Sequence, residues 1–216
     1  MSVLSDSYAA AKTNSPILIM KCWKCENEVR KGGIFCPACK TVQPTSDVDH
    51  FTRLDVRRSF EVGEKILELA YYSKQRMLHP DIFIRKSEQE KKYSMGHAVD
   101  LNNAYETLKS PLKRAEYLLK LEGIIVNQDN SSSVKPSQEM LMESLQMREE
   151  LENINSSDQI RKIMVNAIDE RMATIDDIKK YFKSGTLDKA AQATIKMRYL
   201  EKFIEEIKKK SMKLAS

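Results

Sequence analysis

The residues best suited to chemistry are four cysteines in one short stretch near the start of the sequence. They form two pairs with the same spacing, Cys22-x2-Cys25 and Cys36-x2-Cys39, and ten residues separate the pairs. Each pair can make a tight knuckle, and together they can offer four thiolates in the tetrahedral arrangement that suits zinc. The pattern predicts one structural zinc ion, because four protein ligands leave no open position for catalysis.

Other chemistry is open to the same thiols. Two disulfides would need an oxidising compartment, and no secretory signal supports one. A redox-active pair would be expected within a thioredoxin-like βαβ pattern, which does not surround these cysteines. Iron or an iron–sulfur cluster on the four thiolates is less favoured but chemically possible. A structural zinc site is therefore the favoured interpretation.

A second group of polar residues lies between two helical patterns. Apolar residues recur at helical spacing over residues 61–78, and a second helical pattern covers residues 87–108. Proline ends the first pattern, since its ring clashes with the preceding turn and pushes the residue before it out of the α region. The tripeptide His79-Pro80-Asp81 is thus predicted at the tip of a helical hairpin, where it favours docking over catalysis.

This hairpin resembles the J-domain, the module that recruits heat-shock ATPase chaperones of the seventy-kilodalton class. Further segments, in order from about Asp49 onward, resemble the HscB-type J-protein of iron–sulfur cluster assembly. They are NNAYETL at 102–108, SPL at 110–112, RAEYLL at 114–119, LME at 141–143, REEL at 148–151 and KMRYL at 196–200. Several eukaryotic members of this family carry a similar pair of cysteine knuckles, so this feature agrees with the resemblance.

The resemblance implies a co-chaperone with no active site of its own. In the family, the tripeptide contacts the ATPase and favours its hydrolysis-competent state, a role that falls here to His79, Pro80 and Asp81. The basic residues Lys74 and Arg76, with Arg85 and Lys86 beyond the loop, are expected to face an acidic groove of the ATPase; the alternative is an ordinary solvated face, and the two do not exclude each other. Lys74 departs from the family pattern, which usually has an apolar residue there; its stem would cross the edge of the hairpin.

The resemblance also implies a surface that binds the iron–sulfur scaffold protein. Family members use the positions of Leu141, Met142 and Leu145 as an exposed apolar patch, and Tyr199 matches an aromatic position in it. Leu141 and Leu145 are one turn apart and share a helix face. Helical spacing also predicts that Ile195 and Tyr199 lie toward an edge of their helix. The alternative is that these apolar residues belong to the core.

Composition favours a helical protein. Charged residues make up 31% of the 216 residues and aromatic residues 7%, and there are six glycines. The net charge of +5 is interspersed with acids, and no apolar run is long enough to span a bilayer, so we expect no nucleic acid and no membrane as partner. Without a glycine-rich phosphate loop or a triad spacing among His50, His79 and His97, we expect no enzyme; His97 is expected to be a packed or surface residue.

The predicted fold is all-α: a J-domain helical hairpin plus a C-terminal three-helix bundle, with a small N-terminal zinc-knuckle module. The predicted parts are a tail or weak targeting segment at 1–20, a four-cysteine module at 21–41, a J-domain at 50–123 and the bundle at 137–212. The clearest boundary is the serine-rich stretch 127–136. Ser87 with Glu90, and Ser110 before Pro111, are typical of helix starts.

Compartment and rival functions depend on weaker signals. The first twenty residues contain one acid, one lysine and no arginine, a weak mitochondrial presequence at best. We expect the mitochondrial matrix, with the cytoplasm as the alternative, and a homodimer is allowed. The rivals are a generic J-protein with another client, and a zinc-knuckle nucleic-acid-binding protein with a basic rim. That rim would comprise Lys24, Arg30, Lys31 and Lys40.

Overall fold

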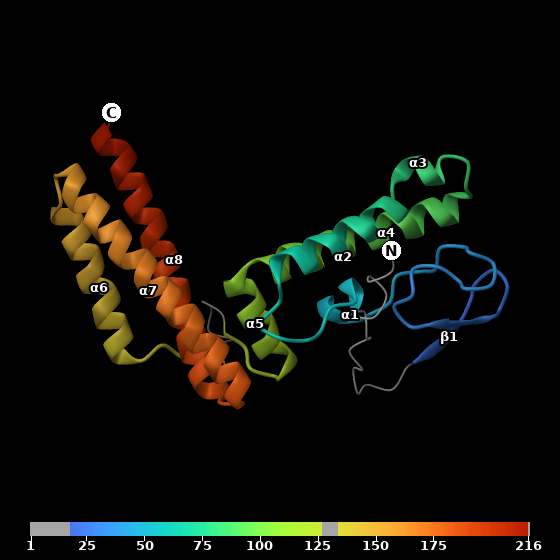
Figure 1. The fold of residues 1–216 in the computed structure, drawn as a ribbon, viewed down its shortest axis with the longest axis horizontal. Coiled ribbons are helices and arrows are strands. Elements are labelled where there is room, and N and C mark those ends of the chain that lie inside the picture. Colours follow the sequence, from blue (N-terminus) through green and yellow to red (C-terminus); the bar gives the residue numbers. More distant parts are fainter. Residues whose placement is uncertain (1–17, 127–133, 216) are drawn as a thin grey trace, which may run out of the picture. The chain divides into compact units, whose positions relative to one another are not determined.

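The computed structural model describes residues 18–126 and 134–215, which fall into two compact units divided between Lys109 and Ser110 (Figure 1). The described elements are helices apart from one two-stranded sheet and an isolated bridge, so the predicted all-α fold is confirmed. None of the described helices combines the length and the apolar character that crossing a membrane requires.

The first unit begins with the cysteine module, which is built on a short β-hairpin. Strand β1 (Ile19–Lys21) pairs antiparallel with β2 (Glu28–Arg30), and Met20 lies opposite Val29. Val29 is buried among the cysteine side chains. The module is therefore held by its knuckles and by a very small core.

The helices of the first unit pack around one central helix. They are α1 (His50–Leu54), α2 (Glu64–Met77), α3 (Pro80–Phe83) and α4 (Glu88–Lys109). Helix α4 contacts each of the other three, and Figure 1 shows α2 lying along α4 with α3 at the turn between them. This is the hairpin that the sequence predicted.

Local signals explain where these helices start. The backbone N–H of Ser87 donates to Glu90 Oε2 over 3.2 Å, and the N–H of Glu90 donates to Ser87 Oγ over 3.3 Å, which confirms the predicted capping box. Helix α5 (Pro111–Leu121) starts as predicted, because Ser110 Oγ accepts from the N–H of Lys113.

The hairpin is held by apolar packing between α2 and α4. Leu67 on α2 is buried, as are Leu101 and Leu108 on α4. Burying a leucine side chain contributes about 1.5–3 kcal/mol. The Tyr71 and Tyr105 rings stack at a centroid distance of 4.2 Å, so aromatic contact adds to the same interface.

The second unit contains α5, α6 (Gln138–Asn153), α7 (Ser157–Ser184) and α8 (Leu187–Ala215). Its central helix is α8, which packs against the other three. Gly185, with a φ of +70°, ends α7 in the left-handed conformation that favours glycine and allows the short connection to α8. Helices α6, α7 and α8 form the predicted three-helix bundle (Figure 1).

Two apolar clusters form the core of the second unit. One joins Leu119 of α5 to the start of α8, and the other joins Leu151 of α6 to α7 and the later part of α8. Ile195, predicted at an edge, is only 3% exposed and belongs to the first cluster, so that prediction is wrong. The reason is that α8 is covered from several sides, and its buried face is wider than a single stripe.

The predicted domain boundaries differ from these units in one respect. Helix α5 lies within the predicted J-domain 50–123, whereas in the structure it packs against α8. The predicted boundary at 127–136 and the tail 1–20 fall largely outside the described residues. The boundaries therefore stay predictions.

Candidate functional site

Each cysteine pair lies in a backbone knuckle of the same form. The N–H of Glu26 donates to the carbonyl of Cys22, and the N–H of Lys40 donates to the carbonyl of Cys36, both over 3.0 Å. Glu26 and Lys40 each have a φ of 60°, the left-handed region, which turns the chain back just after the second cysteine of each pair. The equal spacing in the sequence thus produces two equivalent turns.

The knuckles bring all four sulfur atoms within 4.8 Å of one another. Cys22 Sγ lies 3.7 Å from Cys39 Sγ, and Cys25 Sγ lies 3.6 Å from Cys36 Sγ. A zinc–sulfur bond of about 2.3 Å in a regular tetrahedron places its sulfurs about 3.8 Å apart, whereas a disulfide requires about 2.05 Å. The arrangement therefore fits four ligands around one metal ion and not two disulfides.

Hydrogen bonds and crowding set the protonation of this cluster. Burial alone would raise the pKa of the Cys22 thiol. The backbone N–H groups of Cys25 and Lys24 and the amide of Gln43 donate to its sulfur and lower this pKa to about 6. A backbone N–H also favours the Cys36 thiolate, but burial and the neighbouring thiols raise its pKa to about 11. A complete set of thiolates therefore needs a cation among them.

Gln43 links the cysteine module to α4. Its side chain is fully buried, and Nε2 donates to Cys22 Sγ over 3.3 Å and to the Thr41 carbonyl over 2.8 Å. The backbone carbonyl of Gln43 lies 2.9 Å from His97 Nε2. Burial lowers the pKa of His97, so the imidazole is neutral at pH 7 and donates this bond through Nε2.

Other contacts complete the attachment of the module to α4. The Trp23 ring meets the Tyr93 ring edge-on at 5.7 Å, and Trp23 Nε1 donates to the Val42 carbonyl over 2.7 Å. A Cβ at Gly96 would lie 3.1 Å from Thr45 Cγ2, so glycine permits this close approach to α4. The sequence offered one signal of this contact, a glycine inside a helical pattern, and it was missed.

The His79-Pro80-Asp81 tripeptide follows α2 and forms the start of α3, with His79 as the N-cap and with its polar side chains in solvent. The side chains of His79 and Asp81 are 59% and 78% exposed, and the Asp81 N–H donates to His79 Nδ1 over 3.3 Å. Pro80 is the first residue of α3. Buried Leu78 and Phe83 hold the segment on either side. The tripeptide thus starts a short helix and presents its polar side chains outward.

The basic residues near the tripeptide differ in their surroundings. Lys74 Nζ lies 2.5 Å from Asp55 Oδ2, and the lysine side chain is only 14% exposed. Arg76, Arg85 and Lys86 are exposed. Lys74 is therefore paired with an acid of the first unit, whereas the guanidinium group of Arg76 is exposed to solvent.

An exposed apolar row runs along α6. Leu141, Met142 and Leu145 are 40%, 59% and 58% exposed, whereas Leu151 on the same helix is 5% exposed and belongs to the core. The row therefore contributes little to the core of the second unit. Exposed apolar residues grouped in this way are typical of a surface that binds a partner.

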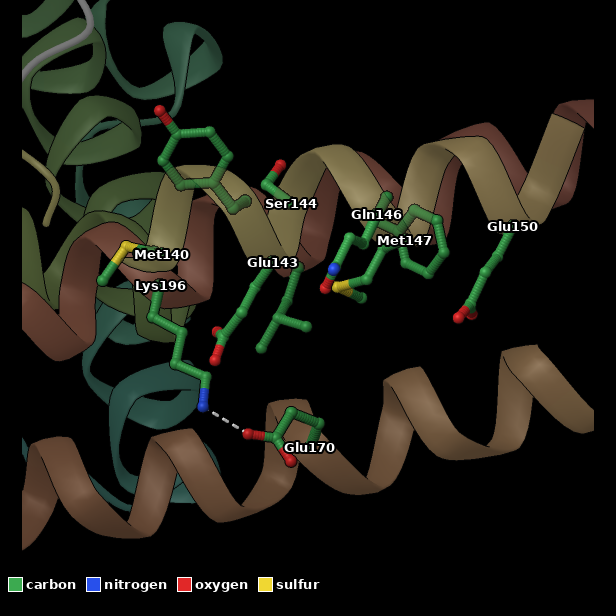
Figure 2. Close-up of a pocket in the computed structure, with 11 residues that line it drawn as sticks. Met140, Glu143, Ser144, Gln146, Met147, Glu150, Glu170 and Lys196 are labelled. Carbon is green, nitrogen blue, oxygen red and sulfur yellow. Dashed lines mark hydrogen bonds and ion pairs between the residues drawn. The ribbon is translucent and has the colours of Figure 1, made fainter. Parts of the chain in front are cut away.

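Tyr199 has a different position from this row. It is partly buried and lines a groove between α6, α7 and α8, together with Met140, Glu143 and Lys196. Figure 2 shows Lys196 reaching toward Glu170 of α7, with which it forms an ion pair. The residues Leu141, Met142 and Leu145 are not among those lining the groove. The structure thus brings the row together but places Tyr199 in the neighbouring groove.

Comparison with known proteins agrees with both units. The HSCB C-terminal oligomerisation domain matches residues 136–208. The mouse iron–sulfur cluster co-chaperone protein HscB is 33% identical over 211 residues, which cover 95% of this chain and 87% of the mouse protein. A human relative of the same name is 32% identical over 213 residues, covering 97% of this chain and 88% of its own length.

Solved structures give the same result. The crystal structure of human HscB has a TM-score of 0.81 and 31% identity, and the match covers 88% of this chain and 98% of the human one. HscB from Vibrio cholerae has a TM-score of 0.69 and 27% identity, with 77% and 99% covered. The chain belongs to the HscB family of J-protein co-chaperones in iron–sulfur cluster assembly.

Proposed function

We propose that this chain stimulates ATP hydrolysis by a heat-shock ATPase chaperone of the seventy-kilodalton class while it holds an iron–sulfur scaffold protein. Cluster transfer to recipient proteins is promoted as a result, in the mitochondrial matrix. One observation carries the proposal. In a chain of this family, the polar side chains of the His79 tripeptide are exposed to solvent, and so are Leu141, Met142 and Leu145, the exposed apolar residues that we call the α6 row. The chain itself contributes binding and no chemical step.

The tripeptide supplies the contact with the ATPase. Leu78 and Phe83 fix the backbone, so little conformational entropy is lost when His79 and Asp81 meet a partner. The Asp81 carboxylate can accept charge-assisted hydrogen bonds from an arginine. Stimulation requires only that this surface bind the hydrolysis-competent conformation of the ATPase more tightly than the other conformations.

Arg76 supports the same contact by attraction at longer range. It is exposed on α2, one residue before the end of the helix, and its charge would meet acidic groups of the ATPase. Charges at the rim of an interface mainly change the association rate and its dependence on salt. Lys74 adds less to this attraction because Asp55 neutralises it.

The α6 row supplies the contact with the scaffold protein. Leu141, Met142 and Leu145 lose water-exposed apolar area when a partner covers them, which favours binding at about 25 cal/mol per Å² of area removed from water. Tyr199 would be reached through the adjoining groove, where a partner side chain would also meet Glu143. The scaffold protein would thus contact both the α6 row and the neighbouring groove that Tyr199 lines.

Zinc on the four cysteines completes the proposal. The sulfur separations suit a tetrahedral site with four protein ligands, which is the usual form of structural zinc. Cys22, Cys25, Cys36 and Cys39 would hold the ion, and its role would be to fold the module. Cys22→Ser should release the ion, detected by a chromogenic chelator, and leave stimulation of the ATPase intact.

The test is steady-state ATP hydrolysis by a mitochondrial heat-shock ATPase, with this chain and a scaffold protein added separately and together. We expect stimulation by this chain alone and a larger, synergistic stimulation with the scaffold. His79→Gln should abolish both effects. Leu141→Ala combined with Leu145→Ala should abolish only the synergy, whereas Met212→Ala, which truncates an apolar side chain 71% exposed on α8, should change neither.

Each alternative gives a distinct result. Stimulation that is indifferent to the scaffold would identify a J-protein with another client. Stimulation retained in His79→Gln would remove the docking role of the tripeptide. If several such ATPases show no response to the folded protein, the proposed function is wrong.

A further inference from the structure

Buried hydrogen bonds link the four cysteines to α4. Gln43 Nε2 donates to Cys22 Sγ over 3.3 Å, and the backbone carbonyl of Gln43 accepts from His97 Nε2 over 2.9 Å. Gln43 and His97 are 0% and 3% exposed, so water does not replace either bond when it is lost. A change at the sulfur cluster therefore reaches α4 through two residues.

Another buried hydrogen bond links α4 to the backbone just before the tripeptide. Ser94 Oγ donates to the carbonyl of Leu78 over 3.0 Å, and both residues are buried. Leu78 is the C-cap of α2 and directly precedes His79. Ser94 and His97 are three residues apart, so they are neighbours on one face of α4. This face thus contacts both the cysteine module and the residue that positions His79.

Two further contacts of the module fall on the same turn of α4. The Trp23 ring meets the Tyr93 ring edge-on, and Thr45 lies close to Gly96. Tyr93 and Gly96 lie on either side of Ser94 in the sequence. The module therefore packs on the turn of α4 that directs the hydroxyl of Ser94 toward the end of α2.

The position of Gln43 depends on what occupies the cysteine cluster. A metal-bound Cys22 is a thiolate, which accepts the amide hydrogen of Gln43 more strongly than a neutral thiol does. Gln43 Oε1 is buried and has no hydrogen-bond partner in the part of the chain that the structure describes. The bonds that Gln43 donates must therefore offset the cost of burying its amide, and one of them ends on a metal ligand. Loss of the metal weakens the hold on Gln43, and with it the contact of its carbonyl with His97.

We propose that metal on the four cysteines stabilises the closed form of the tripeptide segment, which we define as residues 76–84. The metal and the closed segment then favour each other, since coupling between two sites is reciprocal. Without metal the segment opens more often, yet the closed form still predominates, so ATPase stimulation survives in Cys22→Ser. The inference rests on the proposed metal site, and it does not depend on the partner of the tripeptide.

Hydrogen exchange of the full-length chain, with zinc bound and after chelation, tests this coupling. The N–H groups of Leu78, His79 and Ile82 donate to nearby backbone carbonyls, so their exchange reports the opening of the segment. After chelation, peptides over residues 76–84 should exchange at least about tenfold faster. Peptides from α8, which belongs to the second unit, should exchange at an unchanged rate.

Counting the metal first distinguishes two kinds of failure. If a chromogenic chelator takes no zinc from the purified chain, the proposed metal site is wrong and the coupling is wrong with it. If zinc is released and residues 76–84 keep their exchange rates, the metal site stands and the coupling alone is overturned. An equal rise in exchange over residues 101–108 of α4 would also overturn the coupling, because the metal would then stabilise the whole first unit.

Two variants interrupt the link at different points. Ser94→Ala removes the donor to Leu78, and Gln43→Met removes the donor to Cys22 while zinc is kept saturating. In each variant the tripeptide segment should exchange fast with zinc bound, and chelation should change its rate by less than about twofold. Thr107→Ala removes a hydroxyl further along α4 and should keep the full effect of the metal. The full effect in both Ser94→Ala and Gln43→Met would overturn the proposal.

Discussion

His97 donates its Nε2 hydrogen to the backbone carbonyl of Gln43, 2.9 Å away, and so joins α4 to the cysteine module. The imidazole is only 3% exposed, and burial lowers its pKa below the ordinary value of 6.5. Burial disfavours the protonated ring, which carries a charge away from water. Protonation of His97 in this buried position therefore costs stability.

The first prediction concerns pH. Because the pKa of His97 is lower in the folded than in the unfolded chain, the unfolded chain binds more protons as the pH falls below about 6.5, and stability is lost. Unfolding by urea should show this loss between about pH 7.5 and about pH 5.5. His97→Gln keeps an N–H donor without a titrating group, so its stability should depend less on pH.

The comparison must be made with metal bound over the whole range, which absorbance of a cobalt-substituted sample can verify. Equal pH slopes for wild type and His97→Gln would contradict the assignment of the loss to His97.

Local sequence signals predicted where helices start. They did not predict contacts between residues that are distant in the sequence. The capping box of Ser87 and Glu90 lies within four residues, so spacing alone identifies it. The pairing of Lys74 with Asp55 and the burial of Ile195 depend on which elements pack together, which periodicity does not specify.

The candidate site divides in the same way. The four cysteines were evident because their ligand spacing is local, and the tripeptide because the family pattern surrounds it. Gln43 was missed, since an isolated glutamine just after the four-cysteine module has no pattern that links it to Cys22 or to α4. Tyr199 was predicted beside the α6 row, but the packing of α8 sets it in the groove.

The second prediction concerns Gln43 as a partner of the metal ligands. Gln43→Met removes the amide that donates to Cys22 Sγ while it keeps the buried volume. Loss of a buried hydrogen bond to a ligand should lower zinc affinity by about tenfold or more. Competition with a chelator measures this affinity.

Asn27→Ala is the matched control, since Asn27 Nδ2 donates to Cys25 Sγ over the same 3.3 Å from an exposed position. Its effect should be smaller, because water can replace an exposed donor. A larger effect for Asn27→Ala than for Gln43→Met would contradict this account.

The third prediction separates binding from stability on α6. Leu145→Ala should change the free energy of unfolding by less than about 0.5 kcal/mol and weaken scaffold binding, since its side chain is 58% exposed. Leu151→Ala should cost about 2–5 kcal/mol, because its side chain is buried among α7 and α8. Chemical denaturation and a scaffold pull-down together test both. If Leu145→Ala destabilised the chain as much as Leu151→Ala, the row would belong to the core.

The fourth prediction distinguishes two cations on α2. Arg76→Ala should raise the concentration needed for half-maximal ATPase stimulation and reduce its salt dependence. Lys74→Ala should have a smaller effect on that concentration, because Asp55 already neutralises the ammonium group. Titrations of the ATPase at two salt concentrations measure both. Equal effects on binding would show that Lys74 leaves Asp55 to meet the partner.

The central position of α8 has a consequence for how the protein is made. Ribosomes deliver α5, α6 and α7 before α8, yet the main packing of all three is against α8. Apolar residues such as Leu119 and Leu151 therefore stay exposed until α8, which supplies the residues they pack against, has been synthesised. The first unit, whose central helix α4 is complete at Lys109, can fold during translation. A ribosome that stalls before Leu187 would leave a nascent chain with a folded hairpin and an apolar, chaperone-binding remainder.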